Sequence, residues 1–125
     1  MLIKKYIKGN LNSRCHLNSF KHKKNNNSDI YVGFVVNYIK DYIVATPHFF
    51  NVLNDCIIDT TFGTNNDNIY FGKIVLNKYK SANNMFDVEL WSTLYQEPKV
   101  DKMEQLLTLC QKYNLNQLNG AIIDN

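Results

Sequence analysis

Apolar and polar residues between positions 30 and 79 follow the pattern of successive β-strands. Runs rich in β-branched and aromatic side chains alternate with polar loop sequences such as "GTNNDN", which is typical of strands joined by turns. Because the connections are short, the strands are expected to form an antiparallel sheet. The predicted strands cover residues 30–39, 43–53, 56–62 and 69–79.

A helix is predicted before these strands, over residues 14–24. Ser13 can cap its N-terminus, and the basic residues 21–24 suit the C-terminal end of the helix dipole. This helix would place Cys15 at or near its first position.

A second helix is predicted over residues 101–113, where Asp101 and Glu104 resemble a capping box. Segment 86–95 fits neither a helical nor a strand period, and the tail 115–125 is expected to add an edge strand or to stay loose. The apolar stripe makes Cys110 a packing residue. Its members recur at helical spacing and are Met103, Leu106, Leu107, Cys110 and Tyr113.

Together these elements predict a single α+β domain over residues 1–125. The Cys-bearing helix packs on an antiparallel sheet of four or more strands, and a C-terminal amphipathic helix covers part of that sheet. A chain of 125 residues is long enough for one hydrophobic core, and its 45% hydrophobic and 20% charged residues are ordinary globular composition.

Charge and cysteine content restrict the expected partners and compartment. The net charge is +3, with a single Arg at position 14, whereas nucleic-acid-binding domains are usually more basic, so nucleic acid is not the expected partner. The three cysteines have no close spacing, which favours a reducing compartment. No apolar run approaches the roughly 18 to 20 residues that span a bilayer. We expect an intracellular, cytoplasmic protein with no membrane partner.

The hairpin predicted from residues 43–62 brings a His and an Asp together. With residues 54–55 as a two-residue turn, His48 and Asp59 become diagonal neighbours on one face of the strand pair, because side chains alternate along a strand. A shift of one residue would separate them. The predicted neighbour pairs are Leu53–Cys56, Val52–Ile57, Asn51–Ile58, Phe50–Asp59 and His48–Thr61.

Cys15, His48 and Asp59 together form a chemically complete set. A carboxylate bonded to one imidazole nitrogen leaves the other nitrogen free to take a proton from a thiol. A thiol at a helix N-terminus is more readily held as the nucleophilic thiolate, because the helix dipole favours negative charge there.

The chain resembles the papain-like superfamily, within the branch of transglutaminase-like proteins and arylamine N-acetyltransferases. The matching pieces are "SRCHLNS" at 13–19 and "HFFNVLNDCIIDTTF" at 48–62, and the resemblance covers roughly residues 10–75. It implies Cys15 as nucleophile, His48 as general base and acid, and Asp59 as the orienting group. The implied activities are those of a protease, amidase, deamidase or transglutaminase-like enzyme. Such an enzyme acts on amides or thioesters, in proteins or peptides, without a cofactor.

The sequence departs from these families around the nucleophile. Their hairpins are usually longer, and fewer residues precede Cys15 here, so the upstream oxyanion donor has no certain counterpart. The backbone N–H of Cys15 and the side chain of Asn12 or Asn10 are the candidate donors. His16 points to a different side of the helix from Cys15, where it would either line the substrate cleft or lie at the surface, and the surface is the expected position.

Two other readings stay open. A non-catalytic interaction module on the same scaffold would bind protein or nucleic acid, and it would bury Cys15 in apolar contacts. A zinc site is disfavoured because the possible ligands lack finger-like spacing, so no metal is expected. Those ligands are Cys15, His16, His22, His48, Cys56 and Asp59. The oligomeric state is left undetermined.

Overall fold

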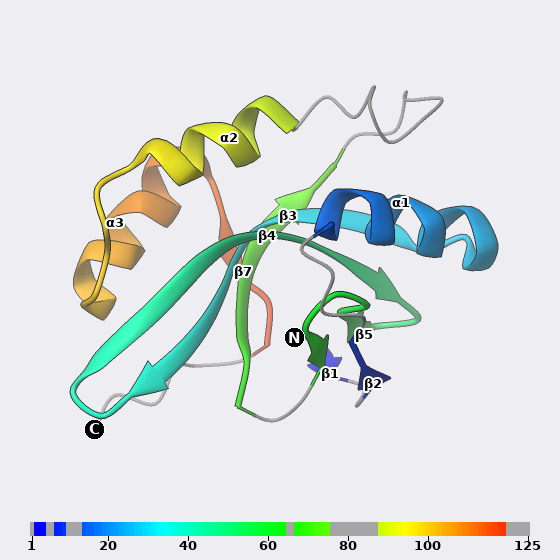
Figure 1. Cartoon of the computed structure of the whole chain (residues 1–125), viewed down its shortest axis with the longest axis horizontal. Coiled ribbons are helices and arrows are strands. Elements are labelled where there is room, and N and C mark those ends of the chain that lie inside the picture. The colour runs from blue at the N-terminus through cyan, green and yellow to red at the C-terminus, as the bar shows by residue number, and fades with distance from the viewer. Residues whose placement is uncertain (1, 5–6, 10–13, 65–66, 76–87, 120–125) are drawn as a thin grey trace.

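The computed structural model describes residues 2–4, 7–9, 14–64, 67–75 and 88–119. These residues form an α+β fold, as the sequence predicts (Figure 1). The described helices are α1 (Cys15–Asn26), α2 (Val88–Gln96) and α3 (Met103–Tyr113). The described strands are β1 (Ile3–Lys4), β2 (Ile7–Lys8), β3 (Asp29–Ile39), β4 (Tyr42–Leu53), β5 (Cys56–Ile58), β6 (Gly63–Thr64), β7 (Ile69–Ile74) and β8 (Asn116–Gln117).

The main sheet has the strand order β1-β5-β4-β3-β7-β8. Strands β5, β4, β3, β7 and β8 pair antiparallel, while β1 adds to β5 in parallel. β7 therefore lies beside β3 and not beside β5, so the chain crosses from one side of the β3–β4 hairpin to the other. The predicted antiparallel sheet is confirmed, and β8 is an edge strand, one of the two outcomes expected for the tail 115–125, of which residues 120–125 lie outside the described residues.

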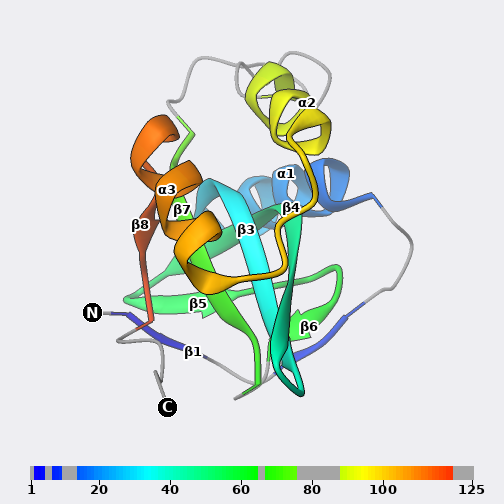
Figure 2. The same cartoon turned by 90° about the vertical axis from the view of Figure 1, so that its left-hand side faces the viewer.

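The helices cover one face of this sheet. Figures 1 and 2 show them on one side, with the short strands β1 and β5 curling beneath the other. Even-numbered residues of β3, such as Val32 and Val36, are buried against the helices, and Val35 is buried on the opposite face. This alternation is what a sheet covered on both faces requires. Of the described helices, none is long and apolar enough to cross a membrane.

The helix ends differ in detail from the prediction. Arg14 is the N-cap of α1 and makes no side-chain capping bond, while Ser13 lies outside the described residues. At α3 the capping side chain is Gln105, whose Oε1 accepts the backbone N–H groups of Asp101 and Lys102 at 3.2 Å each. Glu104 is in the first turn of α3, where its charge suits the helix dipole. The expected Asp101–Glu104 pairing was therefore wrong by one residue.

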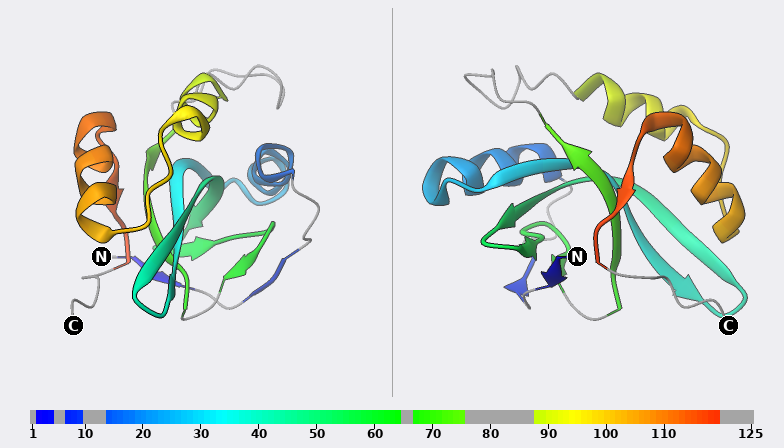
Figure 3. Two further views of the ribbon diagram at one scale, coloured as in Figure 1. Left: turned by 60° about the vertical axis from the view of Figure 1, so that its left-hand side comes forward. Right: turned by 180° about the vertical axis from the view of Figure 1, so that it is seen from behind.

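Two further predictions are settled by packing. Residues 88–95 of segment 86–95 belong to α2, while residues 86–87 lie outside the described residues. α2 turns Trp91 and Leu94 into the core clusters under the helices. Cys110 is buried in α3 among apolar side chains, and burial raises the pKa of its thiol to about 12. Cys110 is thus a packing residue, as predicted. Figure 3 shows α2 and α3 lying over the sheet from two more directions.

Candidate active site

The β4–β5 hairpin adopts the predicted register. Leu53 pairs with Cys56, and the ladder continues to Asn51 and Ile58. The turn residues Asn54 and Asp55 have φ angles of 51° and 63°. Asn and Asp tolerate this left-handed conformation better than most residues, and a two-residue turn with both φ positive matches the twist of the flanking strands. The turn chemistry therefore fixes which residues of β4 face which residues of β5.

Asp59 ends β5 earlier than the sequence predicts. Its Oδ1 accepts the backbone N–H groups of Thr61 and Phe62, each at 3.0 Å, so the chain turns out of the sheet. The backbone N–H of Asp59 donates to Thr64 Oγ1 at 2.6 Å. The ladder stops at Asn51–Ile58, so the predicted Phe50–Asp59 and His48–Thr61 pairs do not belong to it. The physical reason is that an Asp side chain competes for backbone N–H groups and favours a turn.

The turn nevertheless brings His48 and Asp59 together. His48 Nε2 and Asp59 Oδ2 are 2.9 Å apart, and the two residues are 1% and 0% exposed. A buried hydrogen bond between them fixes the orientation of the imidazole, because both partners have lost water as an alternative. The predicted contact thus forms, through a turn and not through the strand ladder.

Tyr70 is a third member of this network that sequence reasoning missed. Its hydroxyl donates to the same Asp59 Oδ2 at 2.7 Å and accepts a bond from Asn68 Nδ2 at 3.2 Å. Burial raises the pKa of Tyr70, and the charge of Asp59 raises it further, so the hydroxyl stays a donor. Asp59 therefore has four hydrogen bonds on its two oxygens. The signal for Tyr70 is its place on β7, which becomes informative only once β7 is known to pair with β3.

Cys15 approaches the same imidazole from the helix side. It is the first residue of α1 and is 6% exposed. Burial by itself lowers the pKa of His48, but hydrogen bonds to Asp59 and Cys15 and the charges of both raise it to about 9. Asp59 occupies Nε2, which leaves Nδ1 as the other imidazole nitrogen. His48 is therefore an imidazolium at neutral pH, held between a carboxylate and a thiol.

Aromatic rings hold the His48 imidazole in place. Phe62 stacks on it with ring centroids 4.5 Å apart, and Phe50 lies on β4 with its centroid 6.3 Å away. Phe62 is 41% exposed, so it forms the outer cover of the ring. On this side, the imidazole is thus shielded from solvent by Phe62, a side chain that is itself partly exposed to solvent.

A second aromatic group lies beside Cys15. Trp91 of α2 packs against His16 and Phe49, with centroids 5.9 and 6.0 Å apart, and its Nε1 donates to the carbonyl of Pro47 at 3.3 Å. His16 is half-buried by this contact and not at the surface as expected, and burial lowers its pKa. Its Nδ1 is buried without a hydrogen-bond partner among the described residues.

Asn51 ties α1 to the sheet on the face opposite His48. Its Nδ2 donates to the carbonyl of Ser19 at 2.9 Å and to Ser28 Oγ at 3.0 Å, and the residue is fully buried. Asn51 therefore positions the helix that carries Cys15. As expected from the register, it is not the residue that orients His48.

The candidate oxyanion donors divide between described and undescribed residues. Asn12 and Asn10 lie outside the described residues. Cys15 is the first helical residue, and the N–H groups of the first turn have no carbonyl partner within the helix. Of the candidate donors, the backbone N–H of Cys15 is therefore the one that lies within the described residues. Within the described part of the chain, no three His, Cys, Asp or Glu side chains are placed to hold a metal ion.

Two pockets lie outside the Cys15–His48–Asp59 cluster. One, of about 300 Å³, runs along β4 beneath the segment that joins α2 and α3; we call it the β4 groove. It is lined by Phe34, Val44, Ala45, Thr46, Pro47, Leu94, Tyr95, Glu97, Pro98, Lys99, Val100 and Leu109. Its lining includes Pro47, the neighbour of His48, and Tyr95, whose pKa is raised by burial and by the charge of Cys15.

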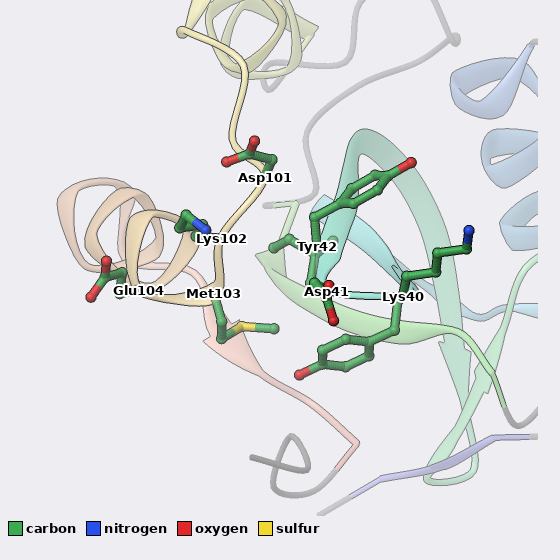
Figure 4. A pocket seen from close by; sticks show the side chains of 9 residues that line it. Lys40, Asp41, Tyr42, Asp101, Lys102, Met103 and Glu104 are labelled. Carbon is green, nitrogen blue, oxygen red and sulfur yellow. The ribbon is translucent and has the colours of Figure 1, made fainter. Parts of the chain in front are cut away.

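The other pocket, of about 660 Å³, lies at the far end of the β3–β4 hairpin. Figure 4 shows Lys40, Asp41 and Tyr42 on one side of it, and the start of α3 on the other. His48 is five residues beyond Ile43 on β4, about 17 Å at the rise of a strand. The charges lining this pocket are of both signs, so it has no clear preference for an anion or a cation.

Comparison with models of known protein families, with curated proteins and with solved structures gives no match. The residues of the site therefore carry the functional conclusion.

Proposed function

We propose that this protein carries out thiol-dependent acyl chemistry, as a hydrolase or an acyltransferase with Cys15 as nucleophile. The observation that carries the proposal is the buried contact between His48 and Asp59, at 2.9 Å, together with Cys15 at the first position of α1. Hydrogen bonds and charges from both residues raise the pKa of His48 to about 9. An imidazolium beside a sulfur favours the thiolate, which is the form that attacks a carbonyl. The papain-like resemblance of these three residues points to the same chemistry.

The reaction follows from the positions of the protons. Cys15 Sγ attacks the carbonyl carbon of an amide or thioester, and the backbone N–H of Cys15 donates to the oxyanion. The bond to the leaving group breaks as His48 gives it the Nδ1 proton. Water or an amine then attacks the acyl group while neutral His48 takes its proton, and Cys15 leaves as a thiolate. Asp59 holds the imidazole in the orientation that both proton transfers need.

A non-catalytic interaction module is the second candidate. The observation that favours it is burial, since Cys15 is 6% and His48 is 1% exposed. Cys15 also packs against an apolar cluster that includes Ile30, Val32 and Phe49. In such a module the Cys15–His48–Asp59 cluster would serve the fold alone.

The rate of thiol alkylation distinguishes the two candidates. Iodoacetamide labelling of the native protein is followed by mass spectrometry between pH 5 and 9, with Cys56 and Cys110 as internal controls. We expect Cys15 to label faster than half-buried Cys56 below pH 7, where an ordinary thiol of pKa about 8.5 is protonated. In His48→Gln this advantage is expected to disappear.

His22→Gln is the matched control for that experiment. His22 lies further along α1, where its Nδ1 is 2.7 Å from Ser28 Oγ, so the same substitution is made away from the cluster. Its labelling profile should match that of the wild type, and circular dichroism checks that both variants are folded. If Cys15 of the native protein labels no faster than Cys56 at any pH, the catalytic proposal is overturned.

A further inference from the structure

Within the described part of the chain, β5 pairs with β4 only from Asn51 to Leu53, and the register shows which backbone groups of the rest of β4 face the same side. Leu53 and Cys56 flank a two-residue turn, so they exchange hydrogen bonds with each other. Because successive residues of a strand point their N–H and C=O to opposite sides, every odd-numbered residue of β4 faces the β5 side. Two contacts agree: the N–H of Ile43 donates to the carbonyl of Asp101 at 3.0 Å, and the carbonyl of Pro47 accepts from Trp91.

Ala45 lies between these two satisfied positions. β5 ends opposite Asn51, so it does not reach Ala45. Among the described residues, no group is bonded to the N–H or C=O that Ala45 turns to this edge. A residue with both groups free can exchange a pair of hydrogen bonds with one residue of another extended chain.

The β4 groove places apolar surface beside these free groups. Ala45 lines the groove together with Phe34, Leu94 and Leu109. Leu94 is buried in the core cluster, and Leu109 packs against it from α3. A chain paired with Ala45 therefore has an apolar recess for one of its side chains. In strand addition the backbone hydrogen bonds usually give affinity, while such side-chain pockets give specificity.

The groove also extends toward the proposed nucleophile. Its lining includes Pro47, which directly precedes His48 on β4. His48 is three residues beyond Ala45, about 10 Å along the strand. A peptide held at Ala45 would reach the sulfur within roughly three residues. Pro47 limits the pairing, because it has no N–H and its carbonyl is bonded to Trp91.

We infer that the substrate is a polypeptide, and that it binds in extended form by pairing one residue with the free edge of β4 at Ala45, with an apolar side chain in the β4 groove. This inference rests on the proposed function, because the pairing delivers the peptide carbonyl to Cys15. A small acyl donor would make no use of the two free backbone groups of Ala45.

The test uses Ala45→Pro, which removes the outward N–H. Proline is tolerated where the N–H of a strand faces away from the ladder, and Pro47 already occupies such a position on β4. Ala45→Ser keeps the N–H and is the matched control. The probe is an N-acetyl-Val-Leu-Gly vinyl methyl ester, which is a Michael acceptor. The Cys15 thiolate adds to one carbon of its double bond, and a proton adds to the other carbon. The rate at which this probe labels Cys15 is compared with the rate at which iodoacetamide labels Cys15 in the same protein.

We expect the wild type and Ala45→Ser to react with the peptide probe at similar rates. In Ala45→Pro the peptide rate should fall by roughly three- to tenfold, the value of one hydrogen bond, while the iodoacetamide rate at Cys15 stays the same. Equal peptide rates in Ala45→Pro and Ala45→Ser would overturn the inference and leave the proposed function intact. Slow, His48-independent labelling by iodoacetamide would instead overturn the proposed function.

A second copy of the chain is the competing occupant of the edge. If two β4 strands pair with each other, light scattering will show a dimer for the wild type and a monomer for Ala45→Pro. That result would also overturn the inference, because the edge would then be an interface and not a substrate site.

Discussion

Asp59→Asn tests whether the carboxylate holds the charge on His48. The substitution keeps the size of the side chain and removes its charge. The amide oxygen of Asn can still accept the backbone N–H groups of Thr61 and Phe62, which build the turn. The amide nitrogen then faces His48 Nε2 and the hydroxyl of Tyr70. At this position the wild type has a carboxylate oxygen that accepts hydrogen bonds, whereas the amide nitrogen can only donate them. The neutral imidazole, with Nε2 unprotonated, is therefore favoured in the variant.

The magnitude follows from the pKa of His48. In the wild type it is about 9 against a usual 6.5. In the variant the hydrogen bond and the charge of Asp59 are lost. Burial still lowers the pKa of His48, and only Cys15 still raises it. We expect the pKa of His48 to fall by between about 1 and 2.5 units, where each unit corresponds to about 1.4 kcal/mol of preference for the imidazolium.

The same shift predicts how stability depends on pH. The folded pKa of His48 is above its unfolded value, so the folded state binds more protons between the two. The stabilisation is fully present below about pH 6.5 and is lost as the pH rises through about 9. In Asp59→Asn this loss is expected to be smaller, because the two pKa values lie closer together.

The assay is an NMR titration of the imidazole Cε1–H signals from pH 5 to 10. His16 and His22 serve as internal references, because burial lowers the pKa of each. Asp55→Asn is the matched control, an identical substitution at an exposed position of the hairpin turn. A wild-type pKa of His48 at or below 6.5, or the same pKa in Asp59→Asn, would refute the reasoning.

Two further predictions concern residues that support the site. Tyr70→Phe removes the second donor to Asp59 Oδ2 and should lower the free energy of unfolding by about 1 to 2 kcal/mol. Urea denaturation measures this loss, and Tyr42→Phe at the exposed end of the β3–β4 hairpin is the control. An equal loss of stability in both variants would contradict the prediction. Asn51→Ala breaks the bond from β4 to the Ser19 carbonyl of α1 and the bond to Ser28 Oγ, and should lower the free energy of unfolding by about 2 to 3 kcal/mol. Unchanged amide exchange of α1 in this variant would contradict the proposed role of Asn51 in positioning the helix.

The sequence was sufficient wherever a local pattern controls the structure. The two turn residues Asn54 and Asp55 fixed the hairpin register, and the helix expected over residues 14–24, with Cys15 at or near its first position, is confirmed by α1. The contact between His48 and Asp59 was predictable for the same reason, since only eleven residues separate them.

What could not be predicted depends on contacts between distant segments. Tyr70 joins the network only because β7 crosses to the far side of β3, and no local pattern specifies that crossing. β5 is short because the side chain of Asp59 accepts hydrogen bonds from two backbone N–H groups and turns the chain out of the sheet. Strand propensity does not account for this competition between a side chain and the strand ladder for backbone N–H groups. His16 is half-buried because α2 brings Trp91 over it, and the sequence around α2 fitted neither period.

The two carboxylate oxygens of Asp59 have separate structural roles, and this separation affects how substitutions in related sequences are interpreted. Oδ1 builds the turn after β5, while Oδ2 orients His48. A related chain without the proposed chemistry would still need the turn, so Asp59 would persist in it. Cys15 has no part in this turn, and Ser and Ala are also compatible with the first turn of a helix. Variation at position 15, and not retention of position 59, is therefore the mark by which inactive descendants would be recognised.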